Sequence, residues 1–283
     1  DIRVSPLGAG ATNPPQGIHR YKNGDNVVLT YTADPCYDFV KWSGDTNTTA
    51  NRIEVNMWKN KVITAEFKIK TFRITGDMVG SGDIQIIPNP TNGDGTYNCG
   101  DSITLRAYPK NCYDFDKWVY KMGFDSGSVN VNPIGFRIKA DIKGTAYFQI
   151  KKFSLTTSID PIGSGVITKS PDKPEYDCGE VVTLTVNADK CYNFTGWDDG
   201  DKTNPRTVTM DKGSIALKAL LVKKKYTIFA GTDYPESGVV TKNPAKDTLF
   251  CGDSSTLTVT QNCPYSFVKW NDNILTRSRK VYI

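Results

Sequence analysis

Cys191-Tyr-Asn-Phe-Thr-Gly-Trp197 is the stretch that decides the fold, because its pattern of cysteine, tyrosine, phenylalanine and tryptophan recurs along the chain. The other copies run Cys36–Trp42, Cys112–Trp118 and Cys263–Trp270. The four tryptophans follow one another at intervals of about 75 residues, and self-similarity at a fixed period of this kind indicates a repeat architecture.

Two further signals precede each copy, in the same order every time. A glycine turn comes first, at Gly8–Gly10, Gly80–Gly82, Gly163–Gly165 and, in a weaker form, Ser237–Gly238. A glycine and an acidic residue then open an alternating segment, at Gly24–Tyr31, Gly100–Ala107, Gly179–Val186 and Gly252–Val259. These signals define four repeats, residues 1–68, 69–149, 150–222 and 223–283. Repeat 1 lacks the start of its first strand, and repeat 4 lacks its final strand.

Repeat 3 illustrates the secondary structure expected of all four repeats. Its valine, threonine, isoleucine and aromatic residues alternate with a period of two, which is typical of half-buried strands. Val182, Leu184 and Val186 share one face of the longest segment. We expect strands at residues 153–158, 165–169, 180–187, 192–197, 206–210 and 215–221. No window carries a convincing helical period, so the predicted fold class is all-β, with at most short helical turns.

The connectors between repeats are short and basic, at residues 68–71, 149–152 and 222–225. The last strand of one repeat runs almost directly into the first strand of the next, which leaves little slack between them. We therefore expect the tandem array to form an elongated, semi-rigid rod.

Composition excludes several classes of protein. The net charge is only +5 over 283 residues, so no nucleic-acid partner is required. A single histidine, His19, argues against histidine-based catalysis and most zinc sites, and none of the seven cysteines lies in a C-x-x-C spacing. No stretch of 18 apolar residues exists, so we expect no membrane insertion of this segment. We also expect no enzyme, and therefore no catalytic residue, metal or cofactor.

Four stretches of repeat 3 carry a family resemblance: Phe153–Gly165, Tyr176–Val186, Tyr192–Trp197 and Asn204–Lys212. They resemble the divergent internalin B-repeat family of bacterial and archaeal cell-surface proteins. The resemblance covers essentially the whole chain and is loosest in repeat 2, which carries an insertion around residues 120–133. It implies small β-grasp-like modules in tandem on secreted or surface-anchored proteins, where they act as spacers, stalks or adhesive surfaces. It brings no catalytic residues, and the cysteines depart from the commonest members.

The recurring aromatic residues are interpreted as the core of each repeat, because large rings dominate small cores. A sugar-stacking platform is the alternative, above all for the tryptophans at the strand ends. Trp58 has no counterpart in the other repeats, so it is the candidate for an exposed ligand contact. The acidic loops at Ser43–Asn47 and Trp197–Asp201 lack the full ligand set of a calcium site and are interpreted as solvated turns. Asn47 begins an Asn-x-Thr sequon and is the candidate glycosylation site.

The cysteines occupy two sites that flank the long strand of each repeat. The first site holds Cys99, Cys178 and Cys251, with Asn23 in repeat 1, and the second holds Cys36, Cys112, Cys191 and Cys263. A bond within one repeat would have to close a strand of about seven residues, which spans ~23 Å, whereas bonded Cα atoms lie about 5.5 Å apart.

Pairing between adjacent repeats avoids this gap. It predicts the bonds Cys36–Cys99, Cys112–Cys178 and Cys191–Cys251, and leaves Cys263 unpaired. The strand length favours this scheme, and pairing within repeats stays the alternative.

Cysteines used in this way indicate an oxidising compartment, so we expect an extracellular or cell-surface location. The first hypothesis for function is a structural protein, either the stalk of an adhesin or the subunit of a surface filament, whose partners are further repeats or other copies of itself. The alternative is an adhesive module that binds glycans or proteins through exposed aromatic residues. Unpaired sheet edges at the two incomplete repeats would favour head-to-tail polymerisation if the natural chain has these ends.

Overall fold

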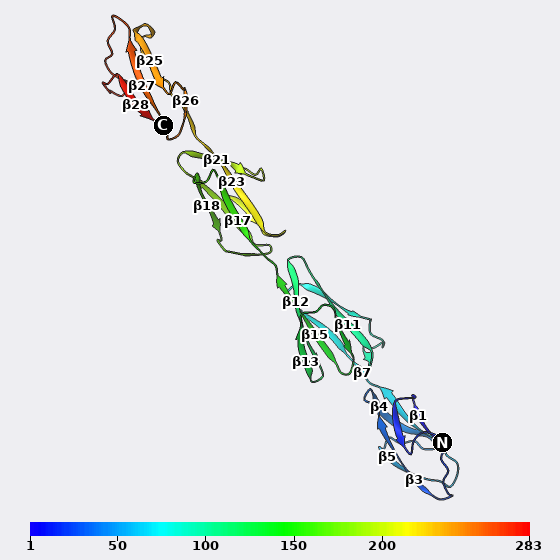
Figure 1. Cartoon of the computed structure of the whole chain (residues 1–283). Coiled ribbons are helices and arrows are strands. Elements are labelled where there is room, and N and C mark those ends of the chain that lie inside the picture. Colours follow the sequence, from blue (N-terminus) through cyan, green and yellow to red (C-terminus); the bar gives the residue numbers. More distant parts are fainter. The chain divides into compact units, whose positions relative to one another are not determined.

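A computed structural model describes residues 1–283, which form strands joined by turns and loops (Figure 1). Its one helical element is a short 3₁₀ turn at Pro235–Ser237, so the all-β prediction is confirmed. The chain divides into two compact units, Asp1–Lys151 and Lys152–Ile283, each containing two repeats. No helix is long and apolar enough to span a membrane.

Repeat 3 contains two sheets of three strands each. The first sheet has the order β17 (Leu155–Asp160), β23 (Ile215–Lys223), β21 (Tyr192–Trp197). The second has the order β18 (Gly165–Ser170), β20 (Val181–Ala188), β22 (Arg206–Thr209). The entry strand β17 runs parallel to the closing strand β23, and all other pairs in the two sheets are antiparallel.

Alternating side chains of both sheets form the core of repeat 3. Val182, Leu184 and Val186 are all buried on one face of β20, as the alternation predicts. Leu217, Ala219 and Leu221 of β23 are buried in the same cluster, together with Trp197 and Tyr176. A strand exposes every second residue, so this arrangement leaves the threonines of β20 on the outer face.

The segment expected as one strand at residues 153–158 divides at Ser154. Lys152–Phe153 forms β16, which pairs antiparallel with β19 (Tyr176–Asp177). Leu155 then starts β17, which pairs with β23 instead. The division arises because the chain entering a repeat changes its hydrogen-bonding partner at this residue.

Repeats 1 and 2 follow the same plan. In repeat 1 the strands are β1 (Ile2–Ser5), β2 (Gly10–Asn13), β3 (Asn26–Ala33), β4 (Tyr37–Gly44), β5 (Arg52–Asn56) and β6 (Ile63–Ile69). In repeat 2 they are β7 (Thr71–Phe72), β8 (Ile74–Val79), β9 (Gly82–Ile87), β10 (Tyr97–Asn98), β11 (Ser102–Pro109), β12 (Tyr113–Met122), β13 (Asp125–Val129), β14 (Ile134–Arg137) and β15 (Ile142–Ile150). The insertion in repeat 2 forms a hairpin, in which β13 adds a fourth strand beside β12.

Repeat 4 has the second sheet but lacks the first. Its strands are β24 (Lys225–Thr227), β25 (Gly238–Asn243), β26 (Thr248–Phe250), β27 (Ser254–Gln261) and β28 (Ser278–Tyr282). The aromatic segment before Trp270 forms no strand. The buried cluster is correspondingly small and consists of Ile228, Leu249 and Leu257.

Candidate functional site at the repeat junctions

Disulfide bonds connect neighbouring repeats. Cys36 is bonded to Cys99 and Cys191 to Cys251, and the Cα atoms are 5.3 Å apart in each pair. Both bonds belong to the between-repeat scheme, because the second-site cysteine of one repeat meets the first-site cysteine of the next. The sequence separations are 63 and 60 residues, so each bond closes a long loop and stabilises the folded chain by about 4 kcal/mol in the chain-entropy model.

The remaining cysteines differ in their bonding. Cys112 and Cys178 are also disulfide-bonded, which agrees with the predicted Cys112–Cys178 pair and leaves that pairing a prediction. Cys263 is exposed and free.

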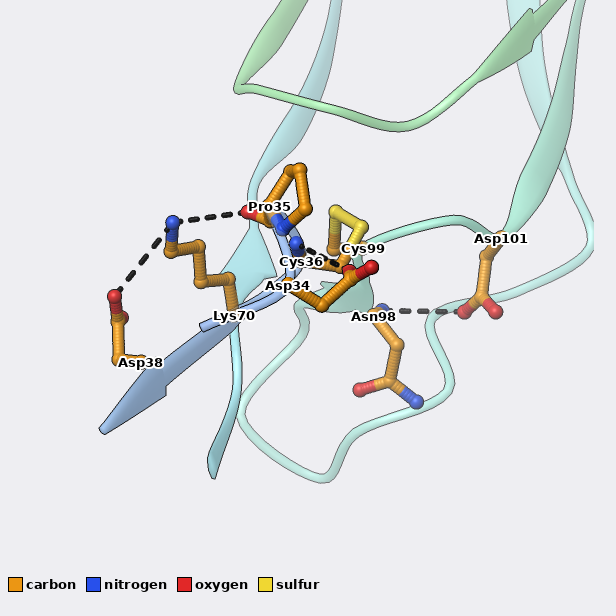
Figure 2. Close-up of a disulfide and its surroundings, with 8 residues drawn as sticks. All are labelled: Asp34, Pro35, Cys36, Asp38, Lys70, Asn98, Cys99 and Asp101. Atoms are coloured by element: carbon orange, nitrogen blue, oxygen red, sulfur yellow. Dashed lines mark hydrogen bonds and ion pairs between the residues drawn. A yellow bond between two sulfur atoms is a disulfide. The ribbon is translucent and has the colours of Figure 1, made fainter. Parts of the chain in front are cut away.

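A lysine, Lys70, lies beside the disulfide at the first junction (Figure 2). The backbone N–H of Lys70 donates to the carbonyl oxygen of Cys36 at 2.8 Å, and its own carbonyl oxygen accepts from the N–H of Cys99 at 2.9 Å. The side chain turns back, so that Nζ donates to the Pro35 carbonyl oxygen at 2.9 Å and lies 3.6 Å from the Asp38 carboxylate. One residue therefore ties the closing strand β6 to the cysteines of both repeats.

The junction between repeats 3 and 4 has the same geometry. The N–H of Lys224 donates to the Cys191 carbonyl oxygen at 2.8 Å, and the N–H of Cys251 donates to the Lys224 carbonyl oxygen at 3.0 Å. Lys224 Nζ donates to the Lys190 carbonyl oxygen at 2.8 Å. Lys151 occupies the same place after β15, with its N–H bonded to the Cys112 carbonyl oxygen at 2.8 Å. The sequence indicates only that the connectors are basic, and the role of this junction lysine emerges from the structure.

The step of glycine and an acidic residue positions each first-site cysteine. Its carboxylate accepts a hydrogen bond from the backbone N–H two residues before the glycine, in the pairs Lys22/Asp25, Asn98/Asp101, Asp177/Glu180 and Phe250/Asp253. The glycines themselves have positive φ, for example +89° at Gly179, which favours glycine over other residues. At Glu180 a hydrogen bond from Lys173 lowers the pKa of the carboxyl group, so the acceptor stays ionised at neutral pH.

The tryptophans are among the most deeply buried rings of repeats 1 to 3. Trp42, Trp118 and Trp197 are at most 2% exposed, whereas Phe39, Phe115 and Phe194 are half-buried. The three indoles thus form cores and offer no sugar-stacking face. An alanine lies opposite each indole on the closing strand, in the pairs Trp42/Ala65, Trp118/Ala146 and Trp197/Ala219.

Unlike the buried core tryptophans, Trp58 lies on the surface, on the rim of an open pocket of about 710 Å³ in repeat 1. Its side chain is 69% exposed, and its ring lies close to Gly24. Tyr21 and Ile18 line the same pocket and are also exposed. Asn47 is exposed in the loop after β4, so the candidate contact residue and the candidate glycosylation site are both accessible.

The acidic loops satisfy their carboxylates with protein groups. Arg206 donates to both oxygens of Asp199 at 2.9 Å, and its guanidinium lies 5.3 Å from the Trp197 ring centroid. Asp201 accepts from Thr203 at 2.8 Å. No group of three or more His, Cys, Asp or Glu side chains is placed to hold a metal ion.

The fold and the junctions define a class of protein, a tandem array of small two-sheet β repeats joined by disulfides. Residues 2–71, 84–152 and 155–224 match the model of a family described as the divergent InlB B-repeat domain. The chain belongs to this family, and the resemblance found in the sequence is confirmed. No curated protein matches the chain.

Two solved structures are similar to the chain at low identity. One is the Bacillus anthracis TIE protein, with 9% identity and a TM-score of 0.39 over 99% of this chain and 64% of that one. Another is the pilus adhesin SpaC from Lactobacillus rhamnosus GG in an open conformation, with 9% identity and a TM-score of 0.20 over 81% and 43%. The chain thus spans less than two thirds of the length of either protein.

Proposed function

We propose that this chain is a structural segment of an extracellular surface protein, serving as the stalk of an adhesin or as part of a surface filament. The observation that carries the proposal is the repeated junction, in which a disulfide and a lysine connect repeat 1 to repeat 2 and repeat 3 to repeat 4. Disulfides persist in oxidising compartments, which supports an extracellular location. Membership of a tandem repeat family supports a role in spacing or display.

Small-angle X-ray scattering tests the stalk directly. An elongated particle is expected, and its maximum dimension should fall in proportion when repeat 1 or repeats 1 and 2 are removed. A compact particle whose dimension barely changes would contradict the proposal. Labelling of intact cells of the source organism with an antibody to the repeats tests the location, and labelling only after lysis would contradict it.

A second candidate function is glycan or protein binding at the Trp58 pocket of repeat 1. The pocket combines the exposed rings of Trp58 and Tyr21 with the basic residues Arg20, Lys59 and Lys61. Aromatic rings of this kind stack on sugars or fill a partner's pocket.

A glycan array with the wild type and Trp58→Ala separates the two functions. Phe124→Ala is the matched control, because Phe124 is a fully exposed ring in the hairpin of repeat 2, far from the pocket in sequence. Binding that disappears only in Trp58→Ala supports the adhesive function. If the wild type binds no glycan on the array, the adhesive function is contradicted for glycans and the structural function remains.

A further inference from the structure

We propose that the junction disulfides route tension away from the bodies of the repeats, so that the chain yields little length when it is pulled from its ends. The proposal deepens the proposed structural function and rests on it for its biological meaning. It starts from connectivity, because a force applied to a chain follows the shortest covalent path between the points of attachment.

The two observed bonds remove long segments from that path. Tension that reaches Cys36 crosses directly to Cys99, so residues 37–98 carry none of it once the bond is taut. In the same way Cys191 passes tension to Cys251 and bypasses residues 192–250. A segment of this size would otherwise release about 200 Å when it unfolds, at 3.3–3.6 Å per residue.

The bypassed segments contain the connection from one repeat to the next. The aromatic strand, the closing strand and the entry into the next repeat all lie between the bonded cysteines, as β4, β6 and β7 do at the first junction. These strands therefore unfold without lengthening the chain. The junction lysine holds the backbone and the disulfide side by side, because Lys70 is hydrogen-bonded to both Cys36 and Cys99.

Residues 1–36 and 251–283 stay on the path at the two ends of the chain. Between the two observed bonds, the segments that remain on the path include the central strands of the second sheets of repeats 2 and 3. If the predicted Cys112–Cys178 bond is present, tension enters repeat 2 at Cys99 and leaves at Cys112, and β11 fills most of that stretch. The strand pairs with β9 over six residues and with β14 over four. Tension along β11 loads these hydrogen bonds together in shear. Its eight residues already span about 26 Å at 3.3 Å each, so full straightening adds little length.

Repeat 3 gives tension the same route through β20. This strand lies between Cys178 and Cys191 and pairs with β18 over six residues and with β22 over four. The strand that separates the two cysteine sites of a repeat, and whose length disfavours bonding within a repeat, is thus also the segment that carries the force. Non-reducing peptide mapping that links Cys112 to Cys178 is the expected preliminary result.

Single-molecule force spectroscopy tests the proposal on the whole chain, held at Asp1 and Ile283. A Cys263→Ser background removes the one free thiol and excludes thiol exchange and dimers. Each reduced disulfide should add about 200 Å to the extension at rupture, by the same 3.3–3.6 Å per residue. The double variant Cys191→Ser/Cys251→Ser should gain that length without reductant, and Cys263→Ser alone should match the wild type.

An oxidised chain that releases segments of about 200 Å, or a double variant that extends no further than its parent, would overturn the proposal. A second measurement does not depend on folding of the variant. The oxidised wild type is held at constant force until no further unfolding occurs, and a thiol reductant is then added. Discrete steps of about 200 Å are expected, and their absence contradicts the proposal. Scattering and cell labelling test the proposed structural function separately. The proposed route of tension can therefore be contradicted while the structural function stands, and the reverse.

Discussion

Repeats 3 and 4 have the same sequence pattern but bury their tryptophans differently. Trp197 is 2% exposed and lies opposite Ala219 of the closing strand β23. Trp270 is only half-buried, because no strand stands at the closing position of repeat 4. In repeat 3 the residues around the tryptophan form β21, whereas the equivalent residues of repeat 4 form no strand.

The loop that follows the tryptophan is nevertheless the same in the two repeats. Trp197 Nε1 donates to the Thr203 carbonyl oxygen at 3.0 Å, and Trp270 Nε1 donates to that of Thr276 at 2.8 Å. The centroids of the phenylalanine and tryptophan rings are 5.8 Å apart in both. Arg279 pairs with Asp272 just as Arg206 pairs with Asp199.

The comparison separates local from long-range determinants of the fold. Turns, ring pairs and ion pairs within about ten residues form without the closing strand. Pairing of the aromatic segment into a sheet requires that strand, since an isolated strand has no hydrogen-bond partner for its backbone. The aromatic cluster of repeat 4 is therefore formed by local contacts alone.

The largest expected effect comes from supplying that strand. A second copy of Asp211–Lys224 appended after Ile283 should pair with the aromatic segment and place the copied Ala219 opposite Trp270. Three apolar side chains equivalent to Leu217, Ala219 and Leu221 would be buried, stabilising repeat 4 by about 5 kcal/mol. Hydrogen exchange of residues 265–270 measures the pairing, and strong protection is expected.

The matched control is the same extension with glutamate in place of the copied Ala219. A charge opposite the indole core would have to be buried without a partner, so protection should be lost. Equal protection with both extensions would show that the added residues do not occupy the closing position.

The next effect is truncation of the two tryptophans. Trp197→Ala removes a buried ring from a complete core and should cost about 3–5 kcal/mol of unfolding free energy. Trp270→Ala removes a half-buried ring and should cost about 1 kcal/mol. Denaturant unfolding of each variant gives the two values. Similar costs would mean that the closing strand does not determine the burial of the ring.

How far the sequence predicts the fold depends on the same distinction. The face formed by Val182, Leu184 and Val186 follows from alternation within one strand, which is a local pattern. Pairing of cysteines between repeats follows from the length of that strand, a purely geometric constraint. The sequence predicts that Trp197 belongs to the core, whereas its pairing with Ala219 could not be predicted, since Ala219 lies in the closing strand beyond β22. The sequence does not indicate the junction lysine for a similar reason, because the contacts of Lys224 are set by where β23 ends beside Cys191.

A smaller loss of stability, equal in repeats 3 and 4, is expected from substitutions in a local turn that both repeats share. Gly179 and Gly252 have φ of +89° and +87°, and an added Cβ would meet nothing within 4 Å. Alanine at either position is therefore strained without being crowded and should cost about 1–2 kcal/mol. Asparagine, which tolerates this conformation, should cost less. Thermal unfolding of Gly179→Ala and Gly252→Ala measures the costs, and a clear inequality would show that this turn also depends on the closing strand.

The smallest effect is a response to acid that should differ between the two tryptophan loops. The hydrogen bond from Arg206 lowers the pKa of Asp199, and that from Arg279 lowers the pKa of Asp272. A carboxyl group with a lowered pKa in the folded state contributes stability above its ordinary value of about 4, and this contribution is lost as the pH falls through the lowered value.

Both ion pairs should therefore weaken only in acid below about pH 4. Trp197 is held in addition by β23 and should keep its place, whereas Trp270 depends on its loop alone. Proton–nitrogen NMR of the indole N–H groups follows each ring separately. The Trp270 signal should shift in acid while that of Trp197 stays fixed. Asp272→Asn should produce the shifted Trp270 signal already at pH 7 and remove its response to acid, and joint movement of the two signals would contradict this account.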